Sequence, residues 1–87
     1  MYELKFLGKV LQDLKKIDFP NQKIIKEKLL ILAENPEVLK NNIKKLAGVK
    51  EDYYRLRVGN YRIIYEKRDN DLIILIIRIG HRGEVYH

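Results

Sequence analysis

Hydrophobic positions in the first part of the chain predict one strand followed by two helices. Residues 2–7 alternate roughly and include aromatic side chains, as a short edge strand does. The next apolar residues recur at helical spacing and form one stripe, made of Val10, Leu11, Leu14 and Ile17. A second helix is expected at about 22–34. The buried face of this helix carries Ile25, Leu29 and Leu32. Pro20 lies at or just before the start of the helix, and Asn35-Pro36 ends it. The two helices should form a hairpin that lies across a sheet.

The second part of the chain predicts three strands joined by turns. Residues 53–58 and 61–67 flank Gly59-Asn60, a two-residue turn signal. Residues 72–79 are apolar on both faces, which is typical of a central strand covered on both sides. The connecting segment 37–50 is expected to hold only a short helical turn near 37–40. The order βααβββ therefore predicts one α+β domain over 1–87, with a two-helix hairpin packed on a small antiparallel sheet.

The register of the predicted hairpin opposes two like charges. If Gly59 and Asn60 are the loop, Arg57 faces Arg62 directly, and Arg55 lies on the same side. Like charges opposite each other on a sheet cost a few tenths to about 1 kcal/mol. An anion bound between the guanidinium groups would remove that repulsion, so we interpret the pair as a phosphate clamp. The alternative is a solvated face whose arginines turn toward separate acids such as Glu66.

Charge and composition narrow the class of partner. The formal net charge is +6, which favours an anionic partner, with nucleic acid first. All six arginines lie in the second half of the chain: Arg55, Arg57, Arg62, Arg68, Arg78 and Arg82. The absence of cysteine excludes disulfides and thiol catalysis, and with the lack of a signal-like start it favours a cytoplasmic protein. The longest apolar run, 72–77, is too short to span a membrane.

Candidate chemistry extends into the segment 80–87. His81 can exchange a proton near neutral pH, Arg82 adds a donor, and Tyr86 can stack on a base or accept a proton. Taken singly, His81 could equally be a surface residue and Tyr86 a packing residue. Serine and threonine are absent, so a hydrolytic role must use water, Tyr86 or a nucleophile in the substrate. RNA supplies such a nucleophile in its 2′-hydroxyl. His81 and His87 lack supporting ligands, and we expect neither a metal nor a cofactor.

Three segments together resemble a known family. They are KLAG at 45–48, YRLRVGNYRIIY at 54–65 and IGHRGEVY at 79–86. With the predicted element order, they resemble the RelE/ParE superfamily of toxins from type II toxin–antitoxin modules, and the RelE branch more than the ParE branch. RelE-type toxins cut messenger RNA in the ribosomal A site. The resemblance implies attack of the 2′-hydroxyl on the adjacent phosphate, leaving a 2′,3′-cyclic phosphate and a 5′-hydroxyl.

The same resemblance assigns roles to single residues. The expected catalytic set is Arg57, Arg62, Arg82, Tyr86 and His81. Three further cations, Arg55, Lys44 and Lys45, are expected to bind RNA. Because arginine does not give up its proton, proton transfer falls to Tyr86 or His81, and the sequence leaves that choice open.

The expected partners follow from this family. They are a cognate antitoxin with an amphipathic, acidic segment, messenger RNA and the ribosome, and promoter DNA contacted through the antitoxin complex; no membrane partner is expected. Two other functions stay open. One is a ParE-like inhibitor of DNA gyrase without catalysis, and the other is an RNA-binding module without cleavage.

Overall fold

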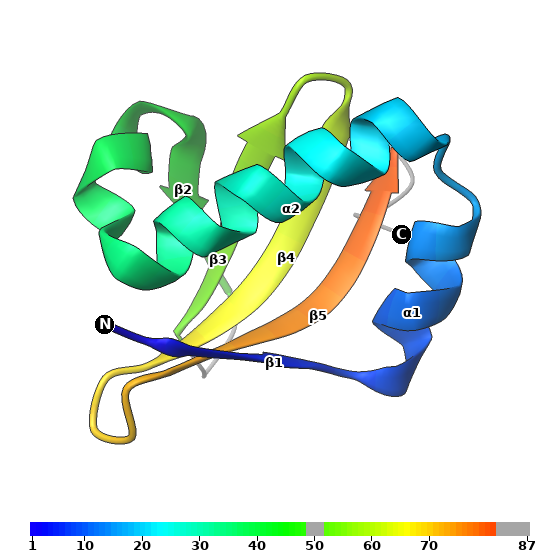
Figure 1. Ribbon diagram of the computed structural model, residues 1–87. Helices are drawn as coiled ribbons and strands as arrows, with labels where there is room; N and C mark the ends of the chain where they lie inside the picture. The colour runs from blue at the N-terminus through cyan, green and yellow to red at the C-terminus, as the bar shows by residue number, and fades with distance from the viewer. Residues whose placement is uncertain (49–51, 82–87) are drawn as a thin grey trace.

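A computed structural model describes residues 1–48 and 52–81. The chain begins with strand β1 (Glu3–Phe6), followed by helices α1 (Gly8–Lys15) and α2 (Phe19–Glu34) and the 3₁₀ helix η1 (Pro36–Asn42). Four strands complete it: β2 (Ile43–Lys45), β3 (Tyr53–Val58), β4 (Tyr61–Arg68) and β5 (Ile73–His81). Figure 1 shows α2 lying across one face of the sheet, with α1 beside the C-terminal part of β5. The α+β class predicted from sequence is confirmed.

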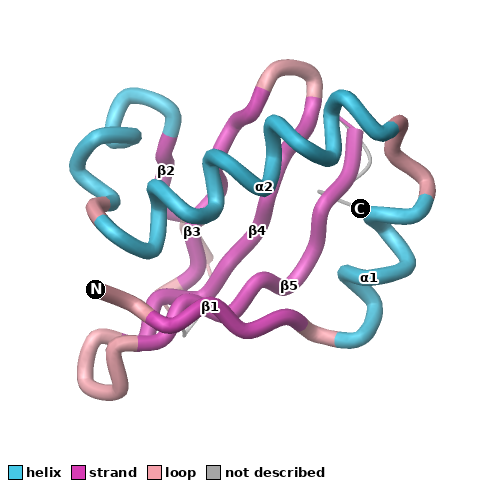
Figure 2. Tube along the Cα trace, in the orientation of Figure 1, coloured by secondary structure: helices cyan, strands magenta, loops and turns pink. Residues whose placement is uncertain are grey.

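The five strands form one mixed sheet in the order β1-β5-β4-β3-β2. Strands β2 to β5 pair antiparallel with their neighbours, whereas β1 pairs parallel with β5. The expectation of a purely antiparallel sheet was therefore wrong at this one edge. The helix hairpin returns the chain across the sheet, which leaves β1 beside the last strand (Figure 2).

The connecting segment also contains a strand that the pattern did not predict. The short helical turn expected near 37–40 is confirmed as η1, but Ile43–Lys45 forms β2 on the outer edge of β3. Ile43 pairs with Leu56, and Lys45 pairs with Tyr54. Three residues are too few for alternation to be recognised, so the edge that β3 offers decides their conformation.

The core lies between α2 and the sheet. As predicted, Ile25, Leu29 and Leu32 are buried on α2. Val10 on α1 and Ile17, just beyond the end of that helix, are buried, but Leu11 is 57% exposed, so its placement in the buried stripe was wrong. β5 is a central strand, as expected, yet only one face is fully covered. Ile74, Ile76 and Ile79 are buried, whereas the residues on the other face are half-buried.

A carboxylate on α1 completes the edge of β5 beyond the end of β1. The register with β1 ends where Phe6 pairs with Ile76. Past that point, the Ile79 N–H donates to Asp13 Oδ2 over 3.0 Å, and Arg78 Nε donates to the same oxygen over 3.3 Å. Asp13 is only 8% exposed, so these bonds satisfy a charge that burial would otherwise penalise. They fix α1 against the strand that leads to His81.

Among the described residues, no helix combines the length and the apolar character needed to cross a lipid bilayer.

Candidate nucleic-acid interface

The hairpin of β3 and β4 has the register that the sequence predicted. Val58 pairs with Tyr61, and Arg57 pairs with Arg62. Gly59 opens the loop with a φ of 57°, a conformation that a side chain would oppose. The tight turn therefore sets the alternation on both strands, and it brings the two arginines to one side.

Several cations share the sheet face that points away from α2, and four of them occupy directly paired positions on β2, β3 and β4. Lys44 pairs with Arg55 across β2 and β3, and Arg57 pairs with Arg62 across β3 and β4. Residues directly opposite on neighbouring strands lie on the same side, with Cβ atoms about 5 Å apart. Residues two apart on a strand lie about 7 Å from each other on that side. We call these four residues, Lys44, Arg55, Arg57 and Arg62, the arginine face.

Exposure differs among the members of the arginine face. Arg57 and Lys44 are exposed, Arg55 is half-buried, and Arg62 is 7% exposed. The Nε atom of Arg55 is buried and makes no hydrogen bond with the residues that the structure describes. Solvent therefore reaches one member of the Arg57–Arg62 pair and barely reaches the other. Such a partly desolvated site strengthens the attraction of an anion compared with an open surface.

Two acids close to the arginine face form ion pairs with other arginines. Glu66, which the alternative interpretation placed against the arginines, accepts a hydrogen bond from Arg68 Nε over 2.5 Å. Asp13 is bound to Arg78. Across residues 1–48 and 52–81, no salt bridge involves Lys44, Arg55 or Arg57. The geometry favours the interpretation as an anion-binding surface.

Two of the expected site residues lie on the other side of the sheet. Lys45 is next to Lys44 in sequence but points to the opposite face, where its Nζ lies 3.3 Å from Asp52 Oδ1. His81 pairs with Tyr61 in the β4–β5 register, and their ring centroids are 4.8 Å apart. Because Tyr61 belongs to the core side, His81 lies across the sheet from Arg57 and Arg62.

Arg82 and Tyr86 lie outside the described residues, so their expected roles stay predictions.

The pairing of Asp13 with Arg78 was not predicted from the sequence. A signal for it was available, since Asp13 falls on the apolar stripe of α1, between Val10 and Leu14. A carboxylate on a buried helix face needs a cationic or N–H partner. Arg78, in the strand expected to lie centrally, was a candidate for that partner.

Comparison with known proteins shows which family this chain resembles. The sequence model of a family described as the ParE toxin of the type II toxin–antitoxin system parDE matches residues 4–86. The mRNA interferase toxin RelE of Escherichia coli strain K12 is 31% identical over 88 residues, which cover 98% of this chain and 90% of that protein.

Solved structures agree with that match. RelE–RelB complexes are known from Pyrococcus horikoshii and Methanococcus jannaschii. The first superposes with a TM-score of 0.82 at 29% identity, covering 95% of this chain and 97% of the other. The second has a TM-score of 0.74 at 32% identity, and covers 94% of each chain.

Proposed function

Since this chain belongs to the RelE/ParE superfamily of toxins from type II toxin–antitoxin systems, we propose that it is an endoribonuclease that cuts messenger RNA on the ribosome. The observation that carries the proposal is the register that sets Arg57 directly opposite Arg62 on the arginine face. A phosphate between the two guanidinium groups turns a repulsive pair into an attractive triad. Guanidinium groups suit this task, because their planar N–H groups match phosphate oxygens in pairs.

In the proposed reaction, RNA supplies the nucleophile. The 2′-oxygen attacks the adjacent phosphorus, the bond from phosphorus to the 5′-oxygen breaks, and the products are a 2′,3′-cyclic phosphate and a 5′-hydroxyl. Negative charge grows on the phosphate oxygens in the transition state. Arg57 and Arg62, with Arg82, stabilise that charge, and the loss of one such donor lowers the rate by about 10²–10³.

Proton transfer needs a group other than arginine. The proton of the 2′-hydroxyl must leave, and the 5′-oxygen must gain one. We propose Tyr86 as the group that takes the proton or stacks on the neighbouring base. His81 is the second choice, because it lies across the sheet from Arg57 and Arg62.

The proposed RNA-binding roles of the remaining cations depend on the side of the sheet on which each one lies. We propose that Lys44 and Arg55 extend the contact with the RNA backbone from the clamp toward the edge strand β2. Lys45 points away from that path and is paired with Asp52, so we propose that it contributes little to RNA binding.

The proposed protein partner is a cognate antitoxin, because the structural relatives above are complexes of RelE with RelB. We expect an acidic, amphipathic segment of the antitoxin to neutralise the toxin, and the joint complex to bind promoter DNA through the antitoxin.

The test adds the purified chain to a translating extract. We expect cut messenger RNA whose upstream fragments end in 2′,3′-cyclic phosphate. Arg62→Ala and Tyr86→Phe should still bind ribosomes and RNA, with cleavage reduced by about 10²-fold or more. Retained binding with no cleavage by the unmodified chain would instead indicate an RNA-binding module.

A second candidate function rests on the family model, which is described by the ParE toxin. ParE-type toxins inhibit DNA gyrase. A supercoiling assay with purified gyrase separates the two, since intact messenger RNA together with blocked supercoiling would favour gyrase inhibition.

A further inference from the structure

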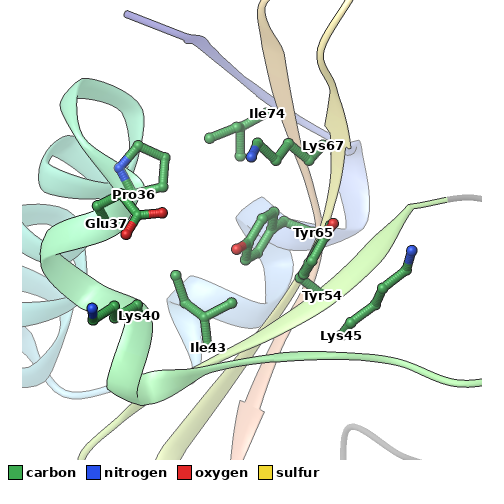
Figure 3. Close-up of a pocket in the computed structure, with 9 residues that line it drawn as sticks. All are labelled: Pro36, Glu37, Lys40, Ile43, Lys45, Tyr54, Tyr65, Lys67 and Ile74. Carbon is green, nitrogen blue, oxygen red and sulfur yellow. The ribbon is translucent and has the colours of Figure 1, made fainter.

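Strand β5 is held differently at its two ends. At its beginning it has a strand on each side, because Ile74 pairs with Leu4 of β1 and with Lys67 of β4. Together with Lys45 and Tyr65, Ile74 and Lys67 line a cavity of about 240 Å³ on the side of the sheet opposite the arginine face (Figure 3). The backbone of this part of β5 is therefore fixed along both of its edges.

The other end of β5 has a strand along one edge only. The last backbone bond from the side of β1 runs from the Leu7 N–H to the Ile76 carbonyl over 3.1 Å. There the chain turns into α1, and among the described residues no strand pairs with the outer edge of residues 78–81. A side chain takes that place, because Asp13 Oδ2 accepts a hydrogen bond from the Ile79 N–H over 3.0 Å.

The carboxylate of Asp13 is itself held in place. Asp13 is 8% exposed and lies, like Val10, on the buried side of α1. Arg78 Nε donates to the same Oδ2 atom over 3.3 Å and balances its charge. A buried carboxylate needs such partners. With both bonds formed, its oxygen is a fixed point against which the end of β5 rests.

This fixed point lies one residue from the strand partner of Arg62. Gly80 pairs with Arg62 across β5 and β4. Because the N–H of Ile79 points outward, the alternation of an antiparallel strand directs the N–H and C=O groups of Gly80 inward, toward β4. Asp13 and Arg62 therefore lie on opposite edges of the same short stretch of β5. A shift of that stretch moves the backbone beside Arg62, whose side chain is 7% exposed and has little room to adjust.

We propose that Asp13 is a positioning residue for RNA cleavage, an inference that rests on the proposed function. By holding the Ile79 N–H, it fixes the backbone beside Arg62 and keeps that guanidinium group where it meets the phosphate in the transition state. Because this effect is one of position, it acts on the rate of the bound complex and not on RNA binding. The place of the acceptor oxygen therefore matters more than the charge of the side chain.

The test compares two conservative variants of the full chain. Asp13→Asn keeps an acceptor oxygen in the same place and loses the charge, whereas Asp13→Glu keeps the charge and moves its oxygens outward by one methylene. Cleavage over a range of concentrations of translating ribosomes separates kcat from KM. We expect Asp13→Glu to lower kcat by about tenfold or more with KM within about twofold, and Asp13→Asn to stay within about threefold of the unmodified chain.

Hydrogen exchange in ¹⁵N spectra follows the position directly. The amide of Ile79 and the Nε–H of Arg62 should exchange with solvent about tenfold faster in Asp13→Glu and as slowly as before in Asp13→Asn. The control is Leu32→Ala, which removes a fully buried side chain in the last turn of α2, away from the end of β5 (Figure 1). It should lower stability and leave kcat unchanged.

Two kinetic results would overturn the inference. One is an equal kcat in Asp13→Asn and Asp13→Glu, whether both fall or neither changes, because the position of the oxygen would then not matter. The other is a raised KM at constant kcat in Asp13→Glu, which would indicate a role in RNA binding. If Asp13→Glu does not fold, Asp13→Ser, whose hydroxyl stops short of the strand, should show the same loss. An unmodified chain that cuts no RNA would overturn the proposed function, while exchange at Ile79 and Arg62 would still test whether Asp13 holds the strand beside Arg62.

Discussion

At the scale of single residues, the Arg57–Arg62 pair places function and stability in opposition. The two arginines face each other on neighbouring strands, and Arg57 is exposed. Its side chain therefore contributes little packing, while its charge repels its neighbour. Selection for stability alone would have replaced one of the two with an acid or a neutral residue.

We expect Arg57→Gln to raise the free energy of unfolding by a few tenths to about 1 kcal/mol, because it removes the like-charge contact. The same variant should cleave RNA about 10²-fold more slowly, because it loses a transition-state donor. Urea unfolding and a cleavage assay measure the two effects. The control is Arg68→Gln, which loses the ion pair with Glu66 and should be slightly less stable without a change in cleavage. A fall in the stability of Arg57→Gln would mean that its charge is already neutralised.

The sequence predicted which side Arg55, Arg57 and Arg62 occupy, but it could not predict the side of His81. The first prediction worked because alternation on two strands was fixed by a two-residue turn. Between β4 and β5, Tyr65 pairs with Ile76 and Ile64 pairs with Arg78, so Ile77 has no partner on β4. That bulge reverses the alternation, and strand pattern alone does not reveal it.

At the scale of elements, β2 separates two neighbouring lysines. Lys44 lies on the arginine face and Lys45 lies on the cavity side. Because no pattern of residues indicated a strand here, both residues were expected to bind RNA. A strand of three residues depends on the hydrogen-bonding edge of β3, which is tertiary information.

The two lysines form a matched pair for an experiment. For single-stranded RNA, the logarithm of the binding constant falls against the logarithm of salt concentration by about 0.7 per neutralised phosphate. Lys44→Gln should lower that slope by about 0.7, whereas Lys45→Gln should leave it unchanged. Fluorescence anisotropy at several salt concentrations measures both slopes. Equal effects of the two variants would contradict the face assignment.

At the scale of the whole molecule, two phenols with raised pKa values set an upper pH limit on stability. Burial raises the pKa of Tyr65 well above its usual value. The hydrogen bond to Asp69 raises the pKa of the Tyr2 phenol. The folded chain therefore keeps these protons at a pH where the unfolded chain loses them, so stability is present below about pH 10 and falls above it.

We expect the free energy of unfolding to decrease above pH 10, with Tyr65 contributing at most about 1.4 kcal/mol per pH unit. Tyr65→Phe removes that proton and should flatten the decrease, with no change in slope between pH 7 and 9. Denaturant unfolding at a series of pH values measures the effect. Parallel curves for the two proteins would show that Tyr65 ionises as easily in the folded state as in the unfolded one.

The parallel pairing of β1 with β5 has a consequence for how the protein folds during its synthesis. Glu3 pairs with Ile73, so the earliest strand to be synthesised waits for almost the entire chain before it finds its neighbour. Contacts this distant along a chain form late and slowly. The sheet can therefore close at this edge only after β5 has been synthesised, long after β1 and the two helices.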